Sequence, residues 1–356
     1  MLASLNSNDN MENNIITEKK ERQSNIELLR CLLMLMIVVV HFLGHNILYH
    51  NDPVQLGESN FLSSNLLFSL CVCAVDCFVL ISGYFSIRFS VKKVFLFLIP
   101  ICFYQLALSL IFYKFHHQIS FNPFRYWFVG PYTFLMIITP IFNGGLTKLS
   151  KERLQLLLLL SILLFFLPVK SILGEAGKNC ATFVFLYIVG FYLRNNDFLK
   201  FKSWGGYLGL YLLSTLLIFV ETFFLCKMGH NTGTVTLSYN YDNILIILAA
   251  VFLFQTFRHI QLQSKFVNWV ATSSFFVYII SENEYVYGHP GLYDLLRVSE
   301  WSNHPLFIIL ILISSISIFV ISIGIDKLRK ILVGPAETKI GEYISKLIDD
   351  KINIID

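Results

Sequence analysis

Long runs of apolar residues repeat along this chain, and few charged residues interrupt them. The first run, residues 31–40, reads CLLMLMIVVV, and similar runs recur as far as residues 307–325. A helix needs about 20 mostly apolar residues to cross the hydrocarbon core of a bilayer. Charged residues are only 14% of the 356 residues and AVILMFWYC residues are 55%, which is more apolar surface than a water-soluble fold can bury. The sequence therefore predicts an all-α polytopic membrane protein.

Basic residues fall in short clusters between the apolar runs, as the positive-inside rule expects of cytoplasmic loops. Placing these clusters inside the cell predicts about ten transmembrane helices, with both termini cytoplasmic. No internal repeat is visible, so the inverted-repeat plan of many transporters receives no support. The predicted spans cover residues 28–48, 65–86, 94–113, 126–142, 154–169, 180–193, 205–225, 242–257, 267–285 and 305–325.

The two ends of the chain differ in composition from the membrane domain predicted for residues 25–332. Residues 1–24 are polar and rich in Asn, Glu and Lys, which predicts a disordered cytoplasmic tail. No small-residue cleavage site follows the first apolar run, so we expect no cleaved signal peptide. Residues 333–356 have the apolar spacing of an amphipathic helix, predicted as a cytoplasmic tail on the inner membrane surface. Its apolar positions are Ile340, Tyr343, Ile344, Leu347 and Ile348.

The cysteines and the net charge indicate no metal, disulfide or nucleic-acid partner. All seven cysteines lie in or beside apolar runs, and none forms a CxxC pair. We therefore expect small membrane-core residues, with no structural disulfide and no zinc. The net charge of +4 gives no indication of a nucleic-acid partner, and a homo-oligomer is left open.

Arg30 and His41 are the first ionisable residues in a predicted span. They are 11 residues apart, so they share one face of a helix, about 16 Å apart in depth. An arginine at the inner boundary can bind a phosphate, and a histidine near the middle of the membrane can accept or donate a proton. The alternative is that Arg30 snorkels to the membrane surface and that His41 bonds to a neighbouring helix.

Asp76 is the next candidate, in the second predicted span. It precedes Arg88 by 12 residues, so its predicted depth matches that of His41. A carboxylate at that level could fix the tautomer of the imidazole and stabilise its charged form. A purely structural bond from Asp76 to His41 or to the backbone is the competing interpretation.

Further polar residues lie towards both membrane surfaces. Ser82 and Gly83 lie nearer the inner surface, where the glycine allows close approach either of a ligand or of another helix. Glu221 and the pair Glu282 and Asn283 are predicted at one level of the outer half. Tyr126 and Trp127 open the fourth predicted span on that side. Carboxylates, amides and aromatic rings together suit a sugar, although interfacial aromatic belts are common.

Four stretches of the chain resemble the acyltransferase 3 family, bacterial inner-membrane enzymes that O-acetylate cell-surface carbohydrates. Asn25–Arg30 followed by His41 is similar to the family's Arg-x10-His signature. Residues 75–84, VDCFVLISGY, resemble its acidic-aromatic-Ser-Gly segment. Residues 127–143 resemble its Trp-to-Pro-Asn helix, and residues 273–280 its late Ser-Phe-x-x-Tyr stretch. The four stretches occur in family order within residues 24–332.

The resemblance implies a multi-pass protein of the bacterial cytoplasmic membrane. It would take acetyl-CoA, or another acyl-CoA, from the cytoplasm and acylate a hydroxyl of a surface polysaccharide or lipid-linked sugar. His41 would be catalytic, as a base or a transient acyl carrier, with Asp76 assisting. The sugar would contact Tyr126, Trp127, Glu221, Glu282 and Asn283. The donor would contact Arg30, Ser82, Gly83, Arg88, Lys92 and Lys93.

The chain departs from the family pattern at two places. Lys92 and Lys93 stand where relatives commonly carry an arginine pair, and lysine lacks the bidentate fork of arginine. Ser281 stands before Glu282 where relatives often have histidine. Two other functions compete with acyl transfer: a transporter or flippase with His41 and Asp76 as a proton relay, and a non-catalytic assembly protein for polysaccharide export.

Overall fold

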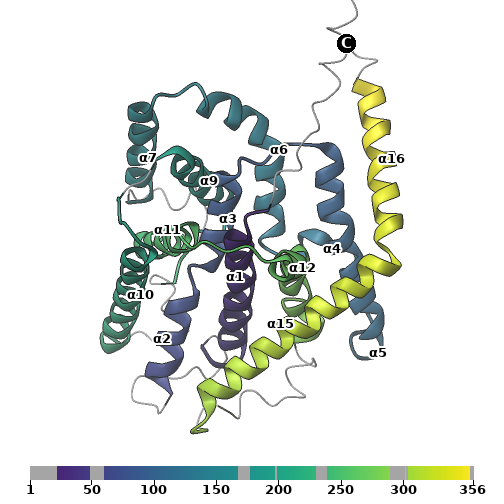
Figure 1. Cartoon of the computed structure of the whole chain (residues 1–356). Coiled ribbons are helices and arrows are strands. Elements are labelled where there is room, and N and C mark those ends of the chain that lie inside the picture. Colours follow the sequence, from purple (N-terminus) through teal and green to yellow (C-terminus); the bar gives the residue numbers. More distant parts are fainter. Residues whose placement is uncertain are drawn as a thin grey trace, which may run out of the picture.

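The chain folds into a bundle of helices around the N-terminal helix α1 (Figure 1). The computed structural model describes residues 22–48, 60–166, 177–196, 199–229, 239–288, 301 and 304–352, and within these residues no strand occurs. The elements are α1 (Ser24–Leu43), η1 (Gly44–Leu48), α2 (Phe61–Cys71), α3 (Ala74–Tyr84), α4 (Val91–Ile111), α5 (Tyr113–His116), η2 (Pro123–Arg125), α6 (Val129–Leu146), α7 (Lys151–Phe166), α9 (Cys180–Asn195), α10 (Trp204–Lys227), α11 (Ile244–Arg258), α12 (Lys265–Ser281), α13 (Glu284–Tyr287), α15 (Phe307–Leu332) and α16 (Gly334–Ile352).

The predicted all-α membrane protein agrees with this architecture. Within the part of the chain that the structure describes, six helices are long and apolar enough to cross a bilayer, counting α2 and α3 as one span. A helix also occupies each of the other four predicted segments, but α7, α9, α11 and α12 have only 16, 16, 15 and 17 residues. These lengths fall below or at the lower limit of a full span, so the number ten stays a prediction.

Helix α1 lies in the centre of the bundle. Its apolar window is 72% buried, whereas that of α15 is 22% buried. It packs against α2, α3, α11, α12 and α15, which leaves α15 and α10 with broad apolar surfaces for lipid. A polar side chain on α1 is therefore enclosed by protein.

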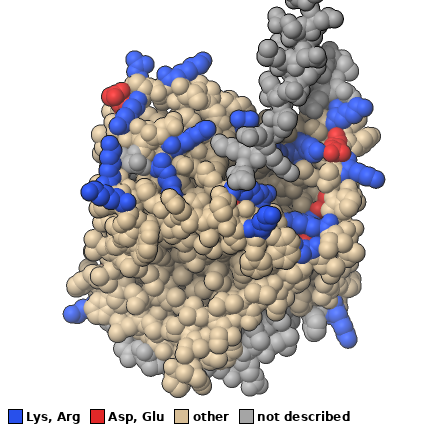
Figure 2. Space-filling model, viewed as in Figure 1, with Lys and Arg blue, Asp and Glu red and all other residues tan. Residues whose placement is uncertain are grey.

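Lys and Arg side chains gather at the end of the bundle where α1 begins, as Figure 2 shows for the visible face. Below them on this face the surface carries few charges. This asymmetry is the one expected if the start of α1 faces the cytoplasm. The predicted tail 1–24 falls almost entirely outside the described residues, because the structure begins at Arg22.

The second span is broken into α2 and α3 at Val72 and Cys73. The Tyr211 hydroxyl donates a 2.6 Å hydrogen bond to the carbonyl of Leu70, beside the break. Such a bond from a neighbouring helix satisfies backbone that helix geometry leaves unpaired inside a membrane. The break thus divides the span into two helices of 11 residues each.

Helix α3 packs closely against α9 through two glycines. A Cβ added to Gly83 would lie 2.1 Å from the Tyr187 carbonyl oxygen, and one added to Gly190 would lie 2.0 Å from that of Leu80. These are backbone atoms that cannot move aside as a side chain can, so each glycine is required by the helix crossing.

A buried network joins α4, α15 and α16. The Asp326 carboxylate accepts hydrogen bonds from Tyr104 at 3.0 Å and from Arg329 at 2.9 Å. Arg329 also pairs with Glu337 on α16. Helix α16 then continues along α4 (Figure 1), with Gly341 against Leu96. The amphipathic tail predicted for 333–356 thus forms a helix docked on α4, with residues 353–356 outside the described part.

We predict that Gly190→Ala destabilises the protein. The added methyl group has no room against Leu80, and overpacking of this kind costs about 1–3 kcal/mol. Thermal unfolding of the detergent-purified protein measures the loss. Gly209→Ala is the matched control, because nothing lies within 4 Å of its Cβ position; equal unfolding temperatures for the two variants would contradict the close packing.

Candidate functional site

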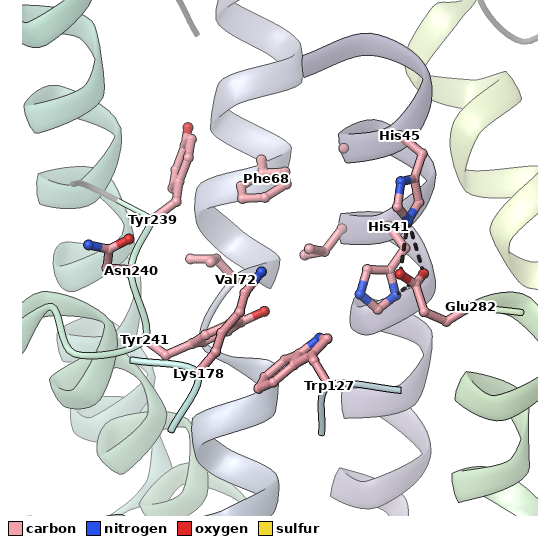
Figure 3. A pocket seen from close by; sticks show the side chains of 12 residues that line it. His41, His45, Phe68, Val72, Trp127, Lys178, Tyr239, Asn240, Tyr241 and Glu282 are labelled. Atoms are coloured by element: carbon pink, nitrogen blue, oxygen red, sulfur yellow. Dashed lines mark hydrogen bonds and ion pairs between the residues drawn. The ribbon is translucent and has the colours of Figure 1, made fainter. Parts of the chain in front are cut away.

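A carboxylate and two imidazoles meet at the outer end of α1. Oxygen Oε2 of Glu282 lies 3.1 Å from Nδ1 of His41, and Oε1 lies 2.9 Å from Nε2 of His45 (Figure 3). The π-helical turn η1 continues α1 past Leu43 and contains His45, which is four residues after His41. The two imidazole rings are stacked with their centres 5.9 Å apart. Single π turns of this kind occur frequently at functional sites.

The position of Glu282 is fixed by the residues that follow α12. The amide of Asn283 donates a 2.9 Å hydrogen bond to the Tyr126 hydroxyl, which itself donates to the Ile279 carbonyl at 2.7 Å. The side-chain oxygen of Asn283 accepts from the backbone N–H of Tyr285. Tyr126 and Asn283, predicted as sugar contacts, are therefore buried supports of the cluster.

Neither ring nitrogen of His41 forms a hydrogen bond with a described residue, but Oε2 of Glu282 lies 3.1 Å from Nδ1 at ion-pair distance. A carboxylate beside Nδ1 favours the tautomer that carries its proton there, and it stabilises the ring when Nε2 gains a second proton. The arrangement therefore provides a proton acceptor at Nε2, with Glu282 in the orienting role of the acid in a catalytic triad.

An outer cavity of 310 Å³ opens beside the His41 imidazole. Trp127 and Tyr241 form one of its walls, with rings stacked 5.2 Å apart. The ammonium of Lys178 lies 5.4 Å from the centre of the Trp127 ring. Desolvation lowers the pKa of Lys178, and the carboxylate of Glu282 opposes this shift. The cavity therefore combines aromatic faces, a cation and the imidazole.

Asp76, predicted as the partner of His41, is in a different place. It is fully buried in the first turn of α3, and neither of its carboxylate oxygens has a hydrogen-bond partner among the described residues. The expected contact with His41 is therefore absent, and Glu282 occupies that position instead. Equal depth on two helices does not bring two side chains together unless both also point towards each other.

An inner cavity of 550 Å³ opens at the other end of α1. Glu27 is the acidic residue among those that line it, and its carboxylate lies 3.4 Å from the guanidinium of Arg30. The remaining charges are cations from four separate segments, and such a cluster can bind phosphate groups. The cations that line it are Arg22, Arg30, Arg88, Lys93 and Arg194.

A small apolar pocket lies beside α1 at a level between the two cavities, and it shares His41 and Trp127 with the outer one. Met34, Ile37 and His41 line it from α1, and their spacing places them on the face that begins at Arg30. Phe78 and Phe275 line it from α3 and α12. Its volume of 10 Å³ is about that of a single water-sized probe. Among the described residues, the predicted Arg30–His41 face thus runs from the inner cavity to the outer one.

Three other predicted donor contacts lie outside the inner cavity. Gly83 packs against α9, and Ser82 bonds to the Tyr132 hydroxyl at 3.0 Å. Lys92 pairs with Glu342 of α16 at 2.7 Å. Gly83 therefore contacts another helix, which is the alternative to a ligand contact given in the sequence analysis.

Two residues predicted as sugar contacts also differ in whether they line the outer cavity. Trp127 lines the outer cavity, but Glu221 does not, and its carboxylate accepts a 3.0 Å hydrogen bond from Asn243. His45, Lys178 and Arg194 were missed as site residues. The i, i+4 spacing from His41 could have indicated His45, whereas Lys178 lies just before α9 and Arg194 in its last turn, and neither belongs to a pattern.

A family model described as an acyltransferase domain matches residues 23–324. No curated protein and no solved structure matches the chain significantly. The matched range begins just before α1 and ends within α15, so it contains every residue that lines the outer cavity and all of those that line the inner cavity except Arg22.

Tyr126→Phe should destabilise the protein although the ring is kept. The change leaves the Ile279 carbonyl and the Asn283 amide unpaired in a buried position, which costs about 1–3 kcal/mol. Thermal unfolding of purified protein tests this, with Tyr113→Phe as control because Tyr113 is 46% exposed. A Tyr126→Phe protein as stable as the control would show that this hydroxyl does not support the Glu282 position.

Proposed function

The chain belongs to the acyltransferase 3 family, and we propose that it moves an acetyl group from cytoplasmic acetyl-CoA to a sugar hydroxyl. The acceptor would be a cell-surface polysaccharide or its lipid-linked precursor. The family match indicates an acyltransferase, and the apolar helices indicate a multi-pass membrane protein. The bacterial cytoplasmic membrane as its location is part of the proposal.

The observation that carries the proposal is the position of His41. Its imidazole borders both the outer cavity and the small apolar pocket on the α1 face that leads back to Arg30. A donor that enters from the cytoplasm and an acceptor that enters from outside would therefore meet at the same ring. Transfer across a membrane requires such a meeting point, because neither substrate crosses completely.

The inner cavity suits the phosphates of acyl-CoA. Arginine binds phosphate through two parallel hydrogen bonds, and a cluster of cations on several elements can hold phosphates that lie apart. Arg194 is positioned by a 3.1 Å hydrogen bond to Ser86, and Lys93 by one of 3.2 Å to the Arg88 carbonyl. The pantetheine arm would extend along the α1 face towards His41, displacing the aromatic side chains that line the small apolar pocket.

The reaction would proceed with His41 as general base. Nε2 takes the proton of the acceptor hydroxyl as its oxygen attacks the thioester carbonyl carbon. The C–S bond then breaks, the ester forms, and the proton passes from the imidazolium to the CoA thiolate. Glu282 stabilises the imidazolium between these two transfers.

The transport hypothesis is less well supported. A relay through His41 and Asp76 needs the two side chains to exchange a proton, directly or through water. Asp76 makes no hydrogen bond with the described residues, and its place beside the imidazole is taken by Glu282. No observation favours the assembly-protein hypothesis.

His41→Ala should abolish the transfer of labelled acetyl groups from acetyl-CoA to glycan in isolated membranes. Glu282→Gln keeps the shape of the side chain but removes its charge, and we expect a rate loss of about 10²-fold or more, typical of disabled acid–base catalysis. Glu221→Gln is the matched control, since Glu221 lies outside the cavity, and it should retain the wild-type rate. Unchanged transfer by His41→Ala would eliminate the mechanism.

Arg88→Gln should weaken the use of acetyl-CoA without changing the chemical step. Loss of a charged hydrogen bond to phosphate should raise KM for acetyl-CoA about tenfold, with kcat little changed. Steady-state kinetics over a range of donor concentrations measures the effect, with Arg153→Gln on the exposed start of α7 as control. A wild-type KM in Arg88→Gln would place the donor elsewhere.

A further inference from the structure

The ammonium group of Lys178 is a cation that the proposed reaction does not use. It precedes α9, and its side chain extends into the outer cavity between Val72 and Tyr241 (Figure 3). Its ammonium approaches the Trp127 ring, but it forms no ion pair or hydrogen bond with the described residues. Within the described residues, this positive charge thus has Glu282 near enough to act on its pKa, but no carboxylate in direct contact.

Glu282, the one carboxylate among the described residues that line the outer cavity, is already engaged by other groups. Both oxygens of Glu282 lie within 3.1 Å of His45 Nε2, and Oε2 also lies 3.1 Å from His41 Nδ1. The remaining polar lining, from Asn240, Tyr239 and Tyr241, is uncharged. Glu282 is thus positioned by two imidazoles, and the ammonium of Lys178 stays free to bind an anion that enters.

We propose that Lys178 selects an acceptor sugar that carries an acidic substituent, a carboxylate or a phosphate. This inference rests on the proposed function, and it specifies the class of acceptor. The stacked pair Trp127 and Tyr241 provides an aromatic surface for the apolar face of a sugar ring. With the ring on that surface, a hydroxyl faces His41 and the acidic group pairs with Lys178.

A purely structural lysine would behave differently. A cation over an aromatic ring at an exposed site contributes little stability, and such a contact would be indifferent to the charge of the acceptor. A charge-selecting lysine, in contrast, strengthens the binding of acidic sugars and leaves neutral sugars unaffected. The two roles are therefore separated by comparing matched sugars that differ only in charge.

The test uses the full-length protein purified in detergent and three sugars. The matched pair is p-nitrophenyl β-D-glucuronide and p-nitrophenyl β-D-glucoside, which differ by a carboxylate in place of a hydroxymethyl group, and the third sugar is glucose 1-phosphate. Calorimetry should find that the glucuronide binds about tenfold more tightly than the glucoside, as expected for one charged hydrogen bond. Tighter binding of glucose 1-phosphate would assign the site to phosphate, and tighter binding of the glucuronide to carboxylate.

Variants decide whether Lys178 is responsible. Lys178→Gln should remove the preference for the acidic sugar while the affinity for the glucoside stays the same, and Lys178→Arg should keep the preference. Lys227→Gln, a lysine at the end of α10 outside the cavity, is the control. Equal binding of the matched pair, a preference that survives Lys178→Gln, or no binding of either acidic sugar would overturn the inference. Failure of the proposed function would be distinct: the preference would persist, but wild-type membranes would transfer no acetyl group.

Discussion

The Glu282 carboxylate, held between two imidazoles, is the interaction around which the rest of the site is arranged. A charge enclosed within a membrane bundle costs several kcal/mol unless it is paired, so its two partners must be supplied by the fold. The central helix α1 supplies His41, and the π-helical turn that continues it supplies His45, whose ring stacks on that of His41. The far side is fixed by Tyr126 and Asn283. The cluster thus ties the beginning of the chain to the end of α12.

The arrangement along a single helix could be predicted from the sequence. Helical periodicity is a local property, so the spacing of Arg30 and His41 was sufficient to place them on one face. The cavities at the two ends of that face agree with this prediction. The all-α membrane architecture was equally accessible, because the hydrophobic runs of about 20 residues leave no other class.

Contacts between helices could not be predicted in the same way. Counting residues from the membrane boundary gives the depth of Asp76, but not the direction in which its side chain points relative to His41 on another helix. Glu282 was assigned to the outer half by its depth, yet its contact with His41 depends on how α12 packs against α1. Lys178 lies between two predicted spans, where no periodicity indicates what its side chain contacts.

The apolar packing between the two cavities also matters to the membrane in which the protein is embedded. Two cavities that open towards opposite faces of a bilayer would conduct ions if water joined them, and cells depend on the gradients that such a leak would dissipate. Among the described residues, Phe78 and Phe275 help to line a pocket of only 10 Å³ at the level between the cavities, and apolar side chains packed in this way oppose a continuous file of water. The same side chains that a thioester would have to displace therefore oppose a leak of ions whenever the donor is absent.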